Sequence, residues 1–294
     1  MRAAGSALGG VRSDPGGPPP RPWLAAGMLC WREIIRFLRQ PNRVVGAVGQ
    51  PLLFWLLFGA GMNRVFVVSG QGFREYYFPG TVILSVLFTA IFATISLIED
   101  RREGFLQSVL VAPIPRWSMV LGKVLGGSLL ALGQSLLFLC LALTLGIRVG
   151  WLSGLAVVAL LWVLAVALTS LGFLMAWRMD STQGFHAVMN LVLMPLWLLS
   201  GAFFPVPAWT GGTWTERGLH CLMRVNPVTY GVAGLRGQLY ADMPAVRLGG
   251  LAGEAGTSWM PGLAVSWLVC GAFAVLMFAA ACGMAARPAR GDLL

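Results

Sequence analysis

Residues 99–123 read EDRREGFLQSVLVAPIPRWSMVLGK and lie between two long apolar segments of the chain. Five consecutive charged residues, Glu99–Glu103, directly follow the uncharged run Tyr77–Ile98. A cluster of charges is too costly to place in hydrocarbon, so it marks the point where the chain leaves a lipid bilayer. The stretch therefore predicts a membrane protein and places the end of one of its spans.

The apolar residues after this cluster have the spacing of a short amphipathic helix. Phe105, Leu106, Val109 and Leu110 recur with a helical period and stop before Pro113. A helix of this kind lies at the membrane surface, where a soluble partner can bind it. From these residues alone, a solvated hairpin between two spans is an alternative of similar weight.

Composition supports the membrane assignment. Of the 294 residues, 57% are hydrophobic and only 11% are charged, against about 25% charged residues in soluble domains. The net charge of +10 comes from Lys and Arg residues spread along the chain without an aromatic cluster, so it does not predict nucleic-acid binding. The five cysteines show no CxxC spacing and the two histidines are far apart, so no metal site is expected.

The N-terminal part of the chain divides into a tail and a helix. Residues 1–22 are rich in Gly, Pro and Arg, which predicts a disordered cytoplasmic tail. Between Trp23 and Arg39, apolar side chains step by three and four residues and charged side chains occupy the other face, up to Pro41. This pattern predicts an interfacial helix whose basic side faces an anionic membrane surface. The apolar side chains are Leu24, Met28, Trp31, Ile35 and Leu38.

Six further segments are long and apolar enough to cross a membrane, and none contains Asp, Glu, Lys, Arg or His. The predicted fold class is therefore an all-α polytopic membrane protein. One membrane domain is expected over residues 23–286, followed by a short cytoplasmic tail at 287–294. The six segments are Val44–Met62, Tyr77–Ile98, Val124–Ile147, Trp151–Trp177, Ala187–Phe204 and Gly262–Ala286.

The distribution of Lys and Arg predicts the orientation. Six crossings place both ends of the chain on one side of the membrane. That side carries 14 Lys and Arg residues and the other carries seven, four of them in a long loop where the positive-inside rule has least weight. Both termini and the Glu99–Glu103 cluster are therefore expected in the cytoplasm.

A second short helix is expected between the fifth and sixth spans. The fifth span ends in SGAFFPVPAW, where Pro205 and Pro207 should break the helix. Asn226 is then a candidate helix cap, with Pro227 in the first helical position. The apolar stripe of the helix that follows does not separate a re-entrant helix from one that lies on the outer surface.

Two features inside the spans favour close helix packing. Gly122 and Gly126 form a small-xxx-small pair, and Gln134 is expected to hydrogen-bond to a neighbouring helix. No carboxylate lies within a span, which disfavours an ion-coupled carrier. Neither GxSxG nor HExxH occurs in the sequence, which leaves a membrane-embedded enzyme as a minor alternative.

Together these elements resemble the permease subunit of type-2 ABC exporters, the group that includes bacterial drug and antibiotic efflux permeases. The resemblance covers residues 23–286 and rests on four motifs in the family's order. These are Phe78-Pro79-Gly80 at the start of the second span, Glu99–Lys123, MNLVLMPLWLLSGAFFP from Met189 to Pro205, and NPVTYGVAGLR from Asn226 to Arg236.

The resemblance implies an exporter subunit in a bacterial plasma membrane that moves a hydrophobic or amphipathic substrate (drug, antibiotic or lipid-like) outward. Two separate ATPase subunits would use ATP and magnesium, while this chain would be non-catalytic and bind no cofactor. The sequence agrees, because no G-x-x-x-x-G-K-[ST] motif occurs in it. A second permease chain, expected to be a copy of this one, would complete the assembly. Export of polysaccharide or lipid-linked glycan is the alternative within the family.

The same resemblance assigns three groups of residues. A coupling helix would dock in the ATPase, with Leu106 among its apolar anchors and with its charged side chains setting the register. The coupling residues would be Glu99, Asp100, Arg101, Arg102, Glu103, Gly104, Phe105, Leu106, Val109, Leu110 and Pro113. The substrate path would be lined by Phe88, Phe92, Asn190, Met194 and Trp197. The outer gate would be formed by Leu199, Phe203, Phe204, Pro205, Asn226, Pro227 and Tyr230.

Overall fold

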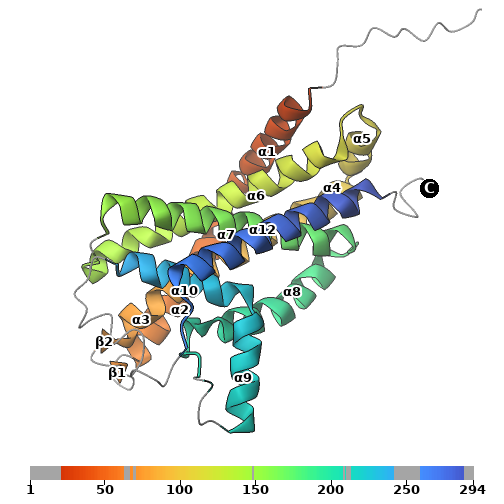
Figure 1. The fold of residues 1–294 in the computed structure, drawn as a ribbon. Coiled ribbons are helices and arrows are strands. Elements are labelled where there is room, and N and C mark those ends of the chain that lie inside the picture. Colours follow the sequence, from red (N-terminus) through yellow and green to blue (C-terminus); the bar gives the residue numbers. More distant parts are fainter. Residues whose placement is uncertain are drawn as a thin grey trace, which may run out of the picture.

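The computed structural model describes residues 21–62, 67–68, 71–147, 149–207, 209, 213–241 and 259–287. In these ranges the chain is almost entirely helical, and 6 helices are long and apolar enough to cross a membrane (Figure 1). The predicted all-α polytopic fold is therefore confirmed. The predicted tails at residues 1–22 and 287–294 fall almost wholly outside the described residues, and residues 242–258 lie outside them as well.

The spans follow the predicted order but begin and end at different residues. The second span consists of two helices with a short break at Thr94, and the fifth ends in a π-helical turn. The span helices are α2 (Pro41–Met62), α3 (Phe73–Ala93) with α4 (Ile95–Arg102), α6 (Arg116–Leu139), α7 (Trp151–Trp177), α8 (Thr182–Trp197) with η2 (Leu198–Ala202), and α12 (Leu263–Ala286). The other elements are α1 (Pro22–Leu38), β1 (Val67–Val68), β2 (Gln71–Gly72), α5 (Phe105–Val111), the 3-10 helix η1 (Cys140–Leu145), α9 (Trp214–Val225) and α10 (Pro227–Leu239).

Helix α3 forms the centre of the bundle. Nearly every side chain from Phe73 to Ala93 is buried, and α3 contacts α2, α6, α7, α8 and α10. Helices α6, α7 and α12 run side by side, with α1, α4 and α5 at one end of the bundle, called the α5 end here (Figure 1). The start of α3, the two-residue β1–β2 hairpin and α10 lie at the opposite end, called the α10 end. Helix α9 projects from the bundle (Figure 1).

The outermost spans leave apolar surface uncovered. Only 18% of the most apolar part of α2 and 17% of that of α12 is buried. In a membrane, apolar surfaces of this kind are stable against lipid or against another protein chain.

Close packing of α1 on α6 depends on the two glycines singled out in the sequence. A Cβ atom at Gly122 would lie 2.7 Å from the carbonyl oxygen of Ala26, and one at Gly126 would lie 2.7 Å from the Cβ of Glu33. No larger residue fits without moving α1. The predicted close approach is confirmed, and the partner is the N-terminal helix. Gln134 also behaves as expected, since its Oε1 accepts a hydrogen bond from Thr89 at 2.7 Å.

The fifth span breaks earlier than the prolines suggest. Gly201 has a φ of 75° within η2, a left-handed conformation that glycine adopts at little cost. The break therefore lies at Gly201 and not at Pro205.

Helix α10 packs among the spans. It contacts α7, α12, α3 and η2, and every residue from Val228 to Arg236 is buried. A helix on the outer surface would leave one face exposed over this length. Helix α10 therefore lies within the bundle and not on its surface.

Candidate functional site

Asp100 is the centre of a group of charged side chains at the α5 end. It lies on α4, its side chain has no exposed surface, and it accepts hydrogen bonds from three cations on two other helices. Arg32 donates to both carboxylate oxygens, at 2.7 Å and 3.0 Å, and Arg36 donates to Oδ1 at 2.6 Å. The third donor is the Nζ of Lys123 on α6. One carboxylate thus connects α1, α4 and α6.

Three further carboxylates complete this group. The Nζ of Lys123 lies 2.5 Å from Oε1 of Glu33, which is buried on α1. Arg36 also pairs with Glu99 and Glu103, each at 3.0 Å. We call the seven residues the ion cluster: Arg32, Glu33, Arg36, Glu99, Asp100, Glu103 and Lys123.

Burial makes the ion cluster sensitive to the loss of any member. Asp100, Glu33 and Lys123 each expose 6% or less of the side chain. Charges removed from water in this way are tolerated only when they are paired and hydrogen-bonded, so losing one partner leaves another charge uncompensated. Burial alone would lower the pKa of the Arg32 guanidinium, but its hydrogen bond to Asp100 raises that pKa, so Arg32 stays charged.

The two arginines that follow Asp100 bind the turn between α7 and α8. Arg101 donates to the carbonyl oxygens of Trp177 and Met179 and pairs with Asp180 at 3.0 Å. Arg102 donates to the carbonyl oxygen of Asp180 at 3.0 Å. The charges that the sequence predicted to contact an ATPase therefore have partners within this chain, and their contact with a second protein stays a prediction.

Helix α5 follows Gly104, which has a φ of 74° and so turns the chain away from α4. The predicted amphipathic helix is present, and the hairpin alternative is wrong. Leu106 is only 3% exposed and belongs to the core of this chain, so it has little surface for direct contact with an ATPase, and its anchoring role stays a prediction. The ring of Phe105 lies under the guanidinium of Arg32, 3.7 Å from its ring centre.

The residues on the exposed side of α5 differ from those predicted to contact an ATPase. Gln107 and Ser108 are exposed, and Val111 is 81% exposed. Val109 and Leu110 are partly buried against the core. The helical period placed the apolar face correctly, but it could not show that this face packs against other helices of the same chain.

The sequence also did not predict that α1 takes part in the ion cluster. Its apolar stripe is largely exposed, as a membrane-facing stripe should be, with Trp31 60% and Met28 62% exposed. Its charged face, in contrast, binds the carboxylates of α4 through Arg32 and Arg36, and does not form a purely basic side toward lipid. The charged face of α1 and the acidic run Glu99–Glu103 were both visible in the sequence, but nothing in it paired them.

The five predicted substrate-path residues divide into two groups. Asn190 and Met194 are exposed on α8, and the partly buried ring of Phe92 lies 5.0 Å from the ring of His186, one turn before Asn190. Phe88 and Trp197 are buried, and the Trp197 Nε1 donates to the carbonyl oxygen of Gly80 at 2.8 Å. The last two therefore pack inside this chain.

The predicted gate residues come together around η2. Asn226 accepts a hydrogen bond from the backbone of Val228 at 3.0 Å and donates to the carbonyl oxygen of Leu196 at 2.6 Å, so the predicted cap of α10 is confirmed and also binds the fifth span. Pro227 is in the first turn of α10, and Leu199 accepts a hydrogen bond from Thr229.

Aromatic contacts connect the rest of the gate group. Phe203 lies between the rings of Phe58, Phe73 and Tyr77, at 5.2 to 5.6 Å. Tyr230 donates to the carbonyl oxygen of Arg224 at 2.9 Å. Phe204 and Pro205 are exposed beside this cluster.

The sequence was compared with models of known protein families. A family model described as ABC-2 type transporter matches residues 25–240, which include all four motifs. The chain belongs to the ABC-2 type transporter family. It is therefore a multi-pass membrane permease of a family that works with ATP-binding subunits.

Two relatives illustrate the range of the family. The inner membrane transport permease YadH of Escherichia coli (strain K12) is 28% identical over 223 residues, which cover 73% of this permease and 82% of that protein. The daunorubicin resistance ABC transporter permease protein DrrB1 of Streptomyces coeruleorubidus is 23% identical over 216 residues, 70% of this permease and 71% of that protein.

Proposed function

We propose that this permease is the membrane subunit of an exporter that moves a hydrophobic or amphipathic substrate outward, driven by ATP hydrolysis in two separate ATPase subunits. The observation that carries the proposal is the position of Asp100, which is fully buried between α1 and α6 on the helix that precedes α5, a helix with one exposed side. Force applied to α5 would reach three helices through one buried carboxylate.

A second copy of the permease would complete the transport path. Asn190 and His186 are exposed on α8 and belong to a membrane span, where polar side chains are stable only beside another helix or in a water-filled space. The uncovered surfaces of α2 and α12 leave room for a second chain. Pairing of two copies around a cavity bordered by α8 would provide a polar environment for Asn190 and His186 and would cover the apolar surfaces.

A drug-like amphipathic substrate is supported by the relative whose name records daunorubicin resistance. The aromatic and Met side chains Phe92 and Met194 beside Asn190 suit a ligand with a large apolar part and few polar groups. The N- and C-termini would lie in the cytoplasm together with α5, in a bacterial plasma membrane.

The docking part of the proposal is tested with Val111→Asp and a matched control, Val225→Asp. The two valines are 81% and 83% exposed, but Val225 lies on α9, away from α5. We expect Val111→Asp to lower recovery of an ATP-binding subunit with tagged permease from native membranes at least about tenfold, the effect of roughly 1.4 kcal/mol on binding. Val225→Asp should have no effect. Equal recovery with both variants would contradict docking at α5.

The transport part is tested with inside-out membrane vesicles and daunorubicin, whose fluorescence reports its uptake. An outward pump should accumulate the drug in such vesicles when ATP is added, and Val111→Asp should abolish this uptake. Accumulation without ATP, or no accumulation of this or other amphipathic dyes, would contradict the proposed substrate class and direction.

A further inference from the structure

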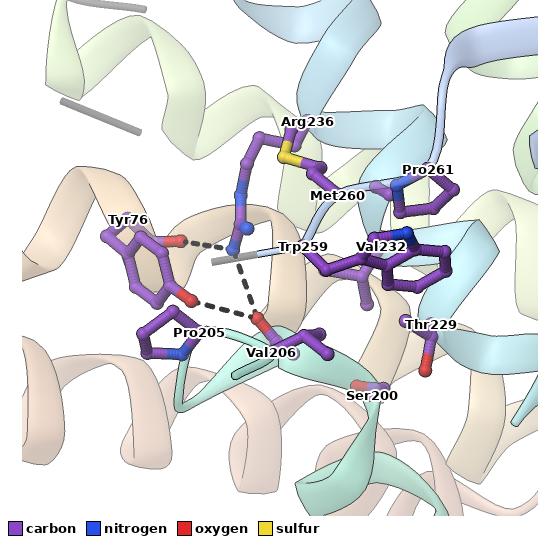
Figure 2. Close-up of a pocket in the computed structure, with 12 residues that line it drawn as sticks. Tyr76, Ser200, Pro205, Val206, Thr229, Val232, Arg236, Trp259, Met260 and Pro261 are labelled. Carbon is purple, nitrogen blue, oxygen red and sulfur yellow. Dashed lines mark hydrogen bonds between the residues drawn. The ribbon is translucent and has the colours of Figure 1, made fainter. Parts of the chain in front are cut away.

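Arg236 is a buried cation without an anionic partner in the described part of the chain. It lies on α10 and is only 6% exposed. Its Nη2 donates to two backbone carbonyl oxygens, that of Tyr76 at 3.2 Å and that of Gly201 at 3.3 Å (Figure 2). Its guanidinium also lies 4.2 Å from the centre of the Tyr76 ring. No carboxylate among the described residues lies within ion-pair distance of it.

These contacts satisfy only part of the guanidinium. An arginine has five N–H donors, yet both hydrogen bonds are made by Nη2, and the buried Nε has no acceptor among the described residues. The carbonyl oxygen of Gly201 also accepts a hydrogen bond from the Tyr76 hydroxyl at 3.1 Å. A buried charge that is paired only with neutral dipoles is costly, and in a membrane protein such a residue usually has a functional partner.

A small cavity lies beside Arg236. It measures about 20 Å³, and Arg236, Ser200, Thr229 and Trp259 are among the residues that line it (Figure 2). The backbone N–H of Trp259 donates to the carbonyl oxygen of Val206 at 2.9 Å, which holds the segment before α12 across the cavity. A volume of this size holds about one water-sized group. It is therefore large enough for a single oxygen atom of a larger ligand.

We propose that Arg236 binds one anionic oxygen, from a carboxylate or phosphate group, in this cavity. The lining combines the cation with apolar side chains of Trp259, Met260 and Pro261, which suits the junction between a charged group and an apolar body. Either the headgroup of an anionic lipid or a free oxyanion supplies this chemistry. Binding of this kind is independent of the proposed export function, because it requires no transport.

The test uses the full-length permease with Arg236→Gln and a control, Arg224→Gln. Arg224 is exposed on α9 with its guanidinium 5.7 Å from the Trp259 ring centre, so the control removes the same charge nearby without replacing a residue that lines the cavity. Thermal unfolding is measured in neutral detergent with inorganic phosphate at constant ionic strength. Retained lipid is counted by native mass spectrometry after reconstitution with phosphatidylcholine, alone or with phosphatidylglycerol.

If the ligand is a free oxyanion, phosphate should raise the Tm of the wild type and of Arg224→Gln by about 2–4 °C at ten times its Kd, and should not raise that of Arg236→Gln. If the ligand is a lipid headgroup, phosphatidylglycerol should be retained by the first two proteins and lost from the third. The proposal is overturned if the wild type responds to neither probe, or if Arg236→Gln responds as the wild type does. Should Arg236→Gln fail to fold, the wild-type result decides, with Arg236→Lys expected to bind more weakly.

Discussion

The Oδ1 atom of Asp100 lies 2.7 Å from Nη2 of Arg32, 68 positions earlier in the chain. Asp100 belongs to the end of the second span and Arg32 to the N-terminal helix, so the pair connects two separate helices. Lys123 on α6 binds the same carboxylate. The α5 end is thus held together by charge pairs in a protein whose other contacts are mostly apolar.

Replacing Asp100 with Asn should destabilise the permease strongly. The substitution keeps the shape of the side chain but removes the negative charge that faces Arg32, Arg36 and Lys123. Breaking a buried ion pair on one side costs roughly 3–5 kcal/mol. We expect a clear fall in the apparent Tm in detergent, together with loss of ATP-dependent transport.

Asp180→Asn is the control for this prediction. Asp180 also pairs with an arginine, Arg101 at 3.0 Å, but its side chain is 89% exposed. An exposed pair contributes only about 0–1 kcal/mol, so the Tm should change little. Equal losses in the two variants would show that burial of Asp100 does not matter.

The number and order of the spans could be predicted because each apolar run exceeds the length needed to cross a bilayer. The residues at which the spans begin and end near charged side chains could not be predicted. Helix α6 begins at Arg116, eight residues before the predicted Val124, and so includes Lys123. A lysine normally ends a span, but Glu33 and Asp100 compensate this one, and those contacts come from distant parts of the sequence.

The candidate sites show the same limit. The cap at Asn226 was predictable because it depends on adjacent residues. The burial of Leu106 and Arg236 was not, since a helical period gives the faces of a helix but not the neighbour of each face. Arg236 was visible as the last residue of a motif, and only the structure shows that it is buried with no carboxylate of the described residues beside it.

Gly122→Ala should separate α1 from α6. The new Cβ would lie 2.7 Å from the Ala26 carbonyl oxygen and 2.8 Å from the Cβ of Leu29, so one helix must move. Overpacking of this kind costs about 1–3 kcal/mol. We expect a lower Tm and faster cleavage of α1 by trypsin, which cuts after its arginines.

Gly133→Ala, on the same helix, provides the comparison. Nothing lies within 4 Å of a Cβ at that position. Alanine favours a helix over glycine by up to about 1 kcal/mol, so this variant should be as stable as the wild type or slightly more so. Faster trypsin cleavage in Gly133→Ala as well would contradict the packing argument.

Asn226→Ala should weaken the junction between α10 and the fifth span. It removes the cap of α10 and the hydrogen bond to Leu196, and loss of a cap alone costs about 0.5–2 kcal/mol. Thr213→Ala removes the cap of α9. Among the described residues, the exposed Thr213 hydroxyl hydrogen-bonds only to Thr215 and Glu216 of α9 itself. Transport and Tm should both fall for Asn226→Ala, whereas Thr213→Ala should leave transport unchanged. Loss of transport in Thr213→Ala but not in Asn226→Ala would exclude this junction from the proposed outer gate.

The orientation of the chain can be tested with two of its own cysteines, each kept as the sole cysteine. Cys221 is exposed on α9, and Cys30 is partly buried on α1. Burial, and then the charge of Glu33, raise the pKa of the Cys30 thiol above its ordinary value. Because the thiolate is the reactive form, a raised pKa means a smaller reactive fraction near pH 7, and the rate should rise about tenfold per pH unit until the pKa is reached.

A membrane-impermeant maleimide should therefore label Cys221 in intact cells. Cys30 should be labelled only after the membrane is made permeable, slowly at pH 7 and faster at pH 8.5. Labelling of Cys30 in intact cells would place α1 and the ion cluster outside the cytoplasm, where no ATPase could reach α5. A pH-independent rate at Cys30 would instead contradict a thiol pKa raised by burial and by the charge of Glu33.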